Sequence, residues 1–95
     1  MFFRVTLLCY EEGGRVNPIK SNYRAPWRHP GDNNELHTGN VVLKRHRCLS
    51  PGQHDIALLQ PLQDAYWKDI KVGDSLDCFE GVKKVATALI LEVFE

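Results

Sequence analysis

The sequence predicts an all-β fold, a small closed antiparallel barrel of about six strands with Greek-key-like connections. Short segments rich in β-branched and aromatic residues recur at fairly even spacing, glycine and proline separate them, and no long stretch is convincingly helical. The 95 residues suffice for one domain, spanning 1–95, that buries about 60 to 65 % of its unfolded surface. A sandwich is the alternative, but closing the sheet removes exposed edges.

The first third of the chain contains a strand, an extended segment and a polar loop. Residues 2–10 are mostly apolar and stop at the turn 11–14, whose two glycines supply the positive φ of a tight hairpin. Residues 18–28 have apolar side chains at a spacing of four, yet prolines bracket them, so they are extended rather than helical. Residues 29–40, rich in Gly, Asn and Pro, form a polar loop.

The middle of the chain contains two more strands, 40–47 and 54–60, joined by a Pro-Gly turn at 51–52. The second strand carries Ile56, Ala57, Leu58 and Leu59 in one apolar run. Leu58 is assigned to the barrel core, so an aspartate there is expected to unfold the protein.

The last third of the chain begins with residues 63–70, where a helical turn competes with an extended segment. The extended segment is favoured because Gly73 soon ends the stretch. Residues 75–79 and 83–94 then form a hairpin around Glu80-Gly81. The final strand is nearly all apolar, which indicates burial on both of its faces.

Composition restricts the cellular setting and the class of partner. Lysine plus arginine equal aspartate plus glutamate, so zero net charge removes the simplest argument for a nucleic-acid or membrane partner. Cys9, Cys48 and Cys78 form no CxxC pair and are odd in number, which favours reduced, buried thiols in the cytoplasm. The apolar N-terminal run is short and contains Arg4, so neither a signal peptide nor a membrane span is expected.

Catalytic and metal sites are not predicted. No acid, base and nucleophile set can be assembled, so the protein is expected to be neither an enzyme nor a cofactor binder. His46, Cys48 and His54 fit no common zinc spacing and lack a fourth ligand. The basic run 44–47 would alternate between the faces of a strand, which is typical of a solvated surface.

Six short motifs follow one another along almost the whole chain. They are Glu12-Gly13-Gly14-Arg15, Asn22-Tyr23-Arg24, Thr38-Gly39-Asn40-Val41-Val42-Leu43, Ser50-Pro51-Gly52-Gln53, Leu59-Gln60-Pro61 and Phe79-Glu80-Gly81. In this order the sequence resembles the C-terminal β-barrel domain of elongation factor Tu. The resemblance implies a barrel of about six antiparallel strands. It also implies no GTP binding, since the GTPase site of that family lies in another domain and this sequence has no GxxxxGK[ST] loop.

The resemblance further implies contact with the T-stem backbone of aminoacyl-tRNA. Arg24 matches the arginine of the family's GYRPQF segment, and Thr38 matches a threonine in its TG turn, so both remain able to contact phosphate. Gln60 stands where some members have a lysine. The segment GYRPQF has become NYRAPW here, and the nucleic-acid surface is therefore reduced.

The family's EGG turn is also altered. Gly81 matches its first glycine, but Val82 replaces the second and would hinder close backbone approach. The family's TVGAG has become KVATA, while Lys83 and Lys84 add charge beside the turn.

We therefore expect a stand-alone binding module. A protein partner, such as a toxin, a nuclease or a translation-related protein, is favoured, and tRNA or another structured RNA is the alternative. The expected partner surface consists of Arg24, Trp27 and Arg28, with Lys83 and Lys84 near it, because Trp and Arg dominate binding hot spots. Trp27 could instead fill the end of the barrel, and Trp67 is equally open between core and interface.

Overall fold

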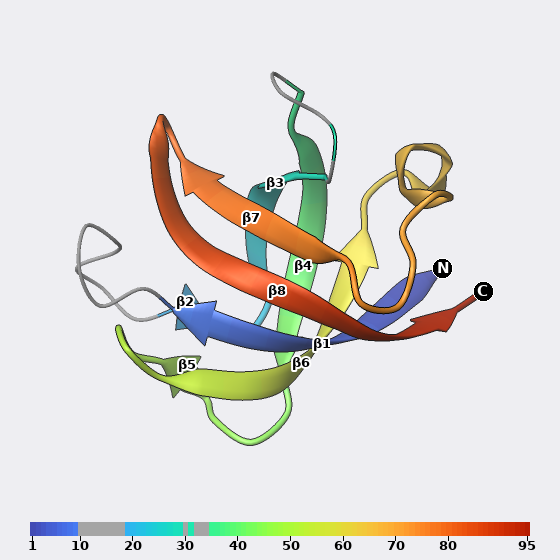
Figure 1. Cartoon of the computed structure of the whole chain (residues 1–95). Helices are drawn as coiled ribbons and strands as arrows, with labels where there is room; N and C mark the ends of the chain where they lie inside the picture. The colour runs from blue at the N-terminus through green and yellow to red at the C-terminus, as the bar shows by residue number, and fades with distance from the viewer. Residues whose placement is uncertain (10–18, 30, 32–34) are drawn as a thin grey trace.

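A computed structural model shows six antiparallel strands that close into a barrel (Figure 1). It describes residues 1–9, 19–29, 31 and 35–95. The barrel strands are β1 (Phe2–Cys9), β3 (Tyr23–Arg28), β4 (His37–Leu43), β6 (His54–Pro61), β7 (Ser75–Glu80) and β8 (Lys83–Phe94). Two short strands, β2 (Ile19–Lys20) and β5 (Cys48–Leu49), pair separately. The prediction of a small all-β barrel is confirmed.

The strand order around the barrel is β1-β6-β4-β3-β7-β8. Strands β3, β4 and β6 are antiparallel neighbours, and β7, the next barrel strand along the chain, returns to the other side of β3, which is a Greek-key arrangement. Strand β8 closes the barrel because it pairs with β7 on one side and with β1 on the other.

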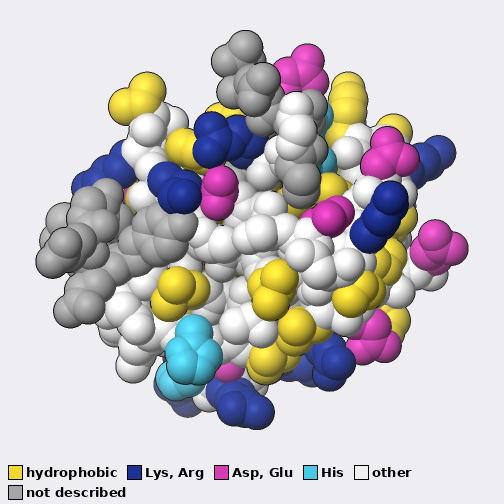
Figure 2. All heavy atoms as spheres, in the orientation of Figure 1, with side chains coloured by type: hydrophobic (Ala, Val, Ile, Leu, Met, Phe, Trp, Pro, Cys, Tyr) yellow, Lys and Arg dark blue, Asp and Glu magenta, His cyan; other side chains and the backbone are white. Residues whose placement is uncertain are grey.

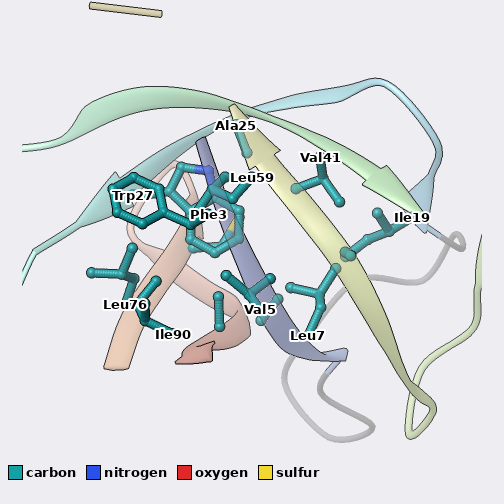
Figure 3. Packing of buried hydrophobic residues seen from close by; sticks show 14 of the residues in the cluster. Phe3, Val5, Leu7, Ile19, Ala25, Trp27, Val41, Leu59, Leu76 and Ile90 are labelled. Atoms are coloured by element: carbon teal, nitrogen blue, oxygen red, sulfur yellow. The ribbon is translucent and has the colours of Figure 1, made fainter. Parts of the chain in front are cut away.

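The core follows from the two-residue period of the strands. In β1 the alternate residues Phe3, Val5, Leu7 and Cys9 are fully buried. Figure 3 shows Phe3, Val5 and Leu7 meeting side chains from β3, β6, β7 and β8 inside the barrel. Cys78 is also fully buried, so Cys9 and Cys78 occupy core positions as expected, whereas Cys48 is half-buried.

Strand β6 corrects the assignment of Leu58. Its inward residues are Asp55, Ala57 and Leu59, while Leu58 is half-buried on the outer face of the barrel. The prediction that Leu58 lies in the core is wrong by one residue, because the run of apolar residues in β6 covers both faces.

Strand β8 is not buried on both faces. Ala86, Ala88 and Ile90 point into the barrel, but Leu89 between them is 42 % exposed. The prediction of double burial is wrong because a barrel wall has only one inner face. Val85 is buried next to Ala86 because the pairing of β7 with β8 shifts register between Cys78 and Phe79.

Residues 63–70 contain a turn of 3-10 helix, η1 (Asp64–Trp67), and the prediction of an extended segment there is wrong. The turn carries Trp67 into the end of the barrel, where it is 1 % exposed and its ring lies 5.7 Å from that of Phe3. Burial of this large side chain outweighs the absence of a side-chain cap at Gln63.

Gly39 in β4 makes room for that tryptophan. A Cβ atom on Gly39 would lie 3.0 Å from Leu59 Cδ1 and 3.1 Å from the Trp67 ring. Both neighbours are buried, so neither can move away without disturbing the core.

Gly39→Ala is therefore expected to lower the free energy of unfolding by about 1 to 3 kcal/mol, as overpacking does in other cores. Urea denaturation followed by tryptophan fluorescence measures it. Thr38→Ala, which adds no atom to the core, is the control. Equal stability of Gly39→Ala and the wild type would show that Trp67 does not pack against β4.

Two further boundaries differ from expectation, at the start and at the end of β4. Strand β4 begins at His37 and ends at Leu43, so it starts inside the predicted loop 29–40, and residues 44–47 form a bend rather than a strand. The turns at Gly52 and Gly81 are confirmed, with φ of 87° and 64°. The predicted hairpin at Gly13-Gly14 lies outside the described residues. Within the described ranges, no helix has the length and apolar character needed to cross a membrane.

Candidate binding groove

Trp27 faces the interior of the barrel. It is 1 % exposed, and its Nε1 donates a hydrogen bond to the Gly39 carbonyl oxygen at 3.2 Å. Arg24 and Arg28 lie on the opposite, outer face of β3. The expectation that Trp27 is an exposed anchor between two arginines is wrong, because odd and even residues of a strand point to opposite faces. Its alternative, a core tryptophan, is confirmed, and Trp67 is a core residue too.

Arg28 and Lys84 share one acidic partner. Arg28 Nη2 lies 3.2 Å from Asp77 Oδ2, and Lys84 Nζ lies 3.7 Å from Asp77 Oδ1. The Arg28 guanidinium also lies 4.7 Å from the centre of the Phe79 ring. Arg28 is thus held on the β7–β8 side of the barrel, about 13 Å along β3 from Arg24 at the usual rise per residue.

Lys83 and the neighbouring turn lie at one end of the β7–β8 hairpin. Lys83 is exposed opposite Glu80, and Val82 at the tip of the turn is fully exposed. Gly81 adopts the left-handed φ that the turn requires. The structure therefore groups Gly81, Lys83 and Lys84 on one hairpin, whose Glu80 accepts a hydrogen bond from the hydroxyl of Tyr23, the residue before Arg24, at 2.6 Å.

Three predicted residues do come together. Arg24, Thr38 and Gln60 line one groove of about 540 Å³ on the outer face of β3, β4 and β6. The described lining is completed by Asn22, Asn40, Pro61 and Leu62. Arg24, Asn40 and Gln60 form one row across the three strands, and Asn40 Nδ2 donates to Gln60 Oε1 at 3.5 Å. We call this hollow the groove.

A second hollow adjoins the groove and has more apolar and aromatic residues in its lining. It measures about 230 Å³ and is lined by Leu36, His37, Thr38, Leu62, Gln63, Tyr66 and Trp67. The two hollows share Thr38 and Leu62, so they are direct neighbours on the surface. We call the second hollow the apolar pocket.

Exposed apolar side chains gather at the apolar pocket. Leu36 is 44 % exposed, Leu62 60 % and Tyr66 57 %. They come from the segment before β4, the residue after β6 and η1, so only the closed fold brings them together. The sequence analysis left Trp67, next to Tyr66, open between core and interface, and it missed both leucines.

The floor of the apolar pocket is continuous with the core. The Tyr66 ring stacks on His37 at 4.8 Å, His37 lies 4.6 Å from His29, and His29 meets Trp67 at 4.3 Å, measured between ring centres. This column of rings runs from the surface to the buried end of the barrel. It fixes Tyr66 in place even though more than half of that side chain is exposed.

A basic edge adjoins the other end of the groove. It consists of Lys20, Lys44, Arg45 and Arg47, all exposed. Ser21 N donates to the Arg47 carbonyl oxygen at 3.3 Å, which holds the bend 44–47 beside Asn22 of the groove. Figure 2 shows Lys and Arg side chains along the lower edge of the molecule, below β6. Within the part of the chain that the structure describes, these four cations form no ion pair.

Asp55 stabilises the backbone conformation of the bend that carries the basic edge. Its fully buried carboxylate accepts hydrogen bonds from Arg45 N at 3.0 Å, His46 N at 3.1 Å and Ile56 N at 2.8 Å, and lies 3.2 Å from His46 Nδ1. Burial is the largest single influence and raises the pKa of Asp55, but the hydrogen bonds together outweigh it. The pKa of Asp55 is therefore lowered below 3.8.

Asp55→Asn is expected to lower the free energy of unfolding by about 2 kcal/mol or more at pH 7, because an amide nitrogen cannot accept these hydrogen bonds. A lowered folded-state pKa means that the contribution of Asp55 is complete above about pH 4 and is lost as the pH falls through the folded pKa. The difference in stability between wild type and variant should therefore shrink below pH 4.

Denaturation midpoints between pH 7 and pH 2.5 measure this effect. Asp69→Asn, at an exposed position, is the matched control and should change stability little. A pH-independent difference between wild type and Asp55→Asn would contradict the lowered pKa.

Metal chemistry finds no support in the described residues. None of their His, Cys, Asp and Glu side chains gather in a group of three or more that could hold an ion. The zinc candidates His46, Cys48 and His54 accordingly form no such group, and His46 is instead engaged with Asp55.

Comparison of the chain with models of known protein families and with curated proteins gives no match. The resemblance to elongation factor Tu therefore rests on the six motifs of the sequence.

Proposed function

We propose that this chain is a non-enzymatic binding module that binds a protein partner through the groove and the apolar pocket. The observation that carries the proposal is the gathering of Leu36, Leu62 and Tyr66, all substantially exposed, around one hollow. Exposed apolar side chains around a concave site are typical of interaction surfaces, and tyrosine is enriched among the residues that dominate binding energy.

The proposal includes a relationship to the C-terminal barrel of elongation factor Tu and a partner connected with translation or a toxin. Two features support the relationship. The barrel has six antiparallel strands, and Asn22 has φ of 67° where the family's motif has glycine. Asparagine is, after glycine, among the residues best suited to this left-handed conformation. The cytoplasmic location belongs to the same proposal.

Structured RNA is the second candidate, and one observation favours it. Arg24, Thr38 and Gln60, which the resemblance assigns to the tRNA backbone, line a single groove that adjoins the basic edge. Hydroxyl, amide and guanidinium groups are the usual contacts to phosphate. The protein partner is preferred because the net charge is zero and because Arg28 and Lys84 are engaged with Asp77.

Cross-linking in cells tests the proposed function with a matched pair of variants. Leu62→Asp changes the apolar pocket, whereas Val72→Asp makes the same kind of change at an equally exposed position, 64 % against 60 %, outside it. We expect discrete proteins to be cross-linked to wild type and to Val72→Asp, and to be lost with Leu62→Asp.

Equal cross-linking of both variants would show that the pocket is not the site. Cross-linked RNA in place of protein, with binding that falls steeply as salt increases, would favour the second candidate. Circular dichroism of both variants establishes that each is folded.

A further inference from the structure

We infer that the ligand of the groove is an extended, acidic segment of a protein that places one bulky apolar side chain in the apolar pocket. This inference rests on the proposed function and names the chemistry of the partner. It follows from the order in which apolar, amide and cationic groups succeed one another across the site.

The apolar pocket fits one side chain rather than a folded surface. Its volume of about 230 Å³ is of the same order as an engineered cavity of about 150 Å³ that binds benzene, which is the scale of one large aliphatic or aromatic side chain. Leu36, Leu62 and Tyr66 surround it with apolar surface. A leucine or aromatic side chain of the partner would remove this surface from water.

The groove supplies partners for an extended backbone. Because β4 is paired with β3 on one side and with β6 on the other along the groove, a peptide cannot add to it there as an edge strand. The amides of Asn22, Asn40 and Gln60 can instead donate to and accept from backbone groups. A segment lying across the row Arg24, Asn40 and Gln60 spans about 10 Å, or roughly three extended residues.

The positive charge of Arg24 indicates that the bound segment carries negative charge. Arg24 is exposed, forms no ion pair with the described residues, and has no acidic neighbour among the described residues that line the groove. A guanidinium in this setting pairs best with a carboxylate, which it binds with two parallel hydrogen bonds. The first acidic residue is therefore expected about three residues from the apolar one.

The basic edge lies beyond Asn22 and adds further cationic groups to the order of apolar, amide and cationic groups across the site. The bend that carries Lys44, Arg45 and Arg47 is fixed by Asp55, so these cations are presented on a rigid backbone. Further acidic residues of the segment would continue in this direction. The resulting pattern has one apolar residue at one end and acidic residues toward the other.

A protein segment fits these features better than a nucleic acid does. Among the described residues that line the two hollows, Arg24 is the one lysine or arginine, and the exposed leucine Leu62 belongs to both linings. A phosphate backbone would gain little from contact with three apolar side chains. An acidic segment with one apolar residue would contact both the apolar pocket and the cationic groups.

Selection from a library of displayed random 12-residue peptides tests the inference. We expect the selected peptides from wild-type protein to share an aromatic or aliphatic residue followed or preceded, about three positions away, by Asp or Glu. A synthetic peptide of the selected sequence should bind Leu62→Asp at least about tenfold more weakly than Val72→Asp.

Charge reversal gives the sharper test. Arg24→Glu should weaken binding of the selected peptide by about tenfold or more. Replacing the peptide's acidic residue with lysine should restore binding to Arg24→Glu while weakening binding to wild type. Lys68→Glu, at an exposed position outside both hollows, is the control for a general effect of charge.

The outcomes separate this inference from the proposed function. Selected peptides without acidic residues that still depend on Leu62 would overturn the inference and leave a protein-binding pocket. Absence of any selected peptide would overturn the inference, and the cross-linking experiment would then decide the function alone. Displacement of the selected peptide by a single-stranded RNA oligomer, lost in Arg24→Glu, would also overturn it and favour RNA.

Discussion

Leu59→Asp is expected to leave the chain unfolded, whereas Leu58→Asp is expected to leave it folded. Leu59 is fully buried between Phe3 of β1 and Val41 of β4, so its aspartate would be a carboxylate without a partner in an apolar interior. That costs several kcal/mol against a total stability of about 5 to 10 kcal/mol for a small domain. Far-ultraviolet circular dichroism and gel filtration measure the outcome.

Leu58→Asp is the matched control in the neighbouring position. Leu58 is half-buried on the outer face, opposite Arg4 of β1, which pairs with Glu92 at 3.1 Å, so a carboxylate there keeps access to water and lies near this ion pair. We expect a loss of about 1 kcal/mol or less. If Leu58→Asp unfolds the protein and Leu59→Asp does not, the register of β6 is shifted by one residue.

The opposite outcomes expected for Leu58→Asp and Leu59→Asp show what the apolar pattern of the sequence can and cannot predict. It predicted the strand at 54–60, because a short run of apolar residues between Pro-Gly and proline has few other solutions. It could not predict which residues face inward, because Ile56 and Leu58 on the outer face are as apolar as Ala57 and Leu59 inside. Pairing with β1 and β4 decides the register.

The residues of the candidate site also divide into those that the sequence could predict and those that it could not. The resemblance to elongation factor Tu named Arg24, Thr38 and Gln60, and these three line one groove. The residues that make the pocket apolar could not be found in this way, because Leu36 lies in a segment predicted as a polar loop and Leu62 follows a proline. They meet only when β4, β6 and η1 are packed together.

The 3-10 turn at η1 marks another limit of local sequence patterns. Residues 63–70 have weak signals for either a helical turn or an extended segment. The helical turn forms because the absence of a side chain at Gly39 leaves space for Trp67 at the end of the barrel. That glycine is 28 positions away in the sequence, so no local window contains both halves of the contact.

Trp27→Ala is expected to lower the free energy of unfolding by about 3 to 5 kcal/mol, because it removes a fully buried indole from the core. For a domain of this size that corresponds to a fall in melting temperature of at least about 12 °C. Differential scanning calorimetry measures it. An exposed, partner-binding Trp27 would instead leave the melting temperature unchanged.

Trp27→Phe separates packing from hydrogen bonding at the same position. Phenylalanine keeps most of the apolar volume but cannot donate to the Gly39 carbonyl oxygen, so a smaller loss of about 1 to 2 kcal/mol is expected. Because Trp27 lines neither the groove nor the apolar pocket, folded Trp27→Phe should bind the selected peptide as tightly as wild type does. Loss of peptide binding in a variant that melts like the wild type would return Trp27 to the interface and contradict its place in the core.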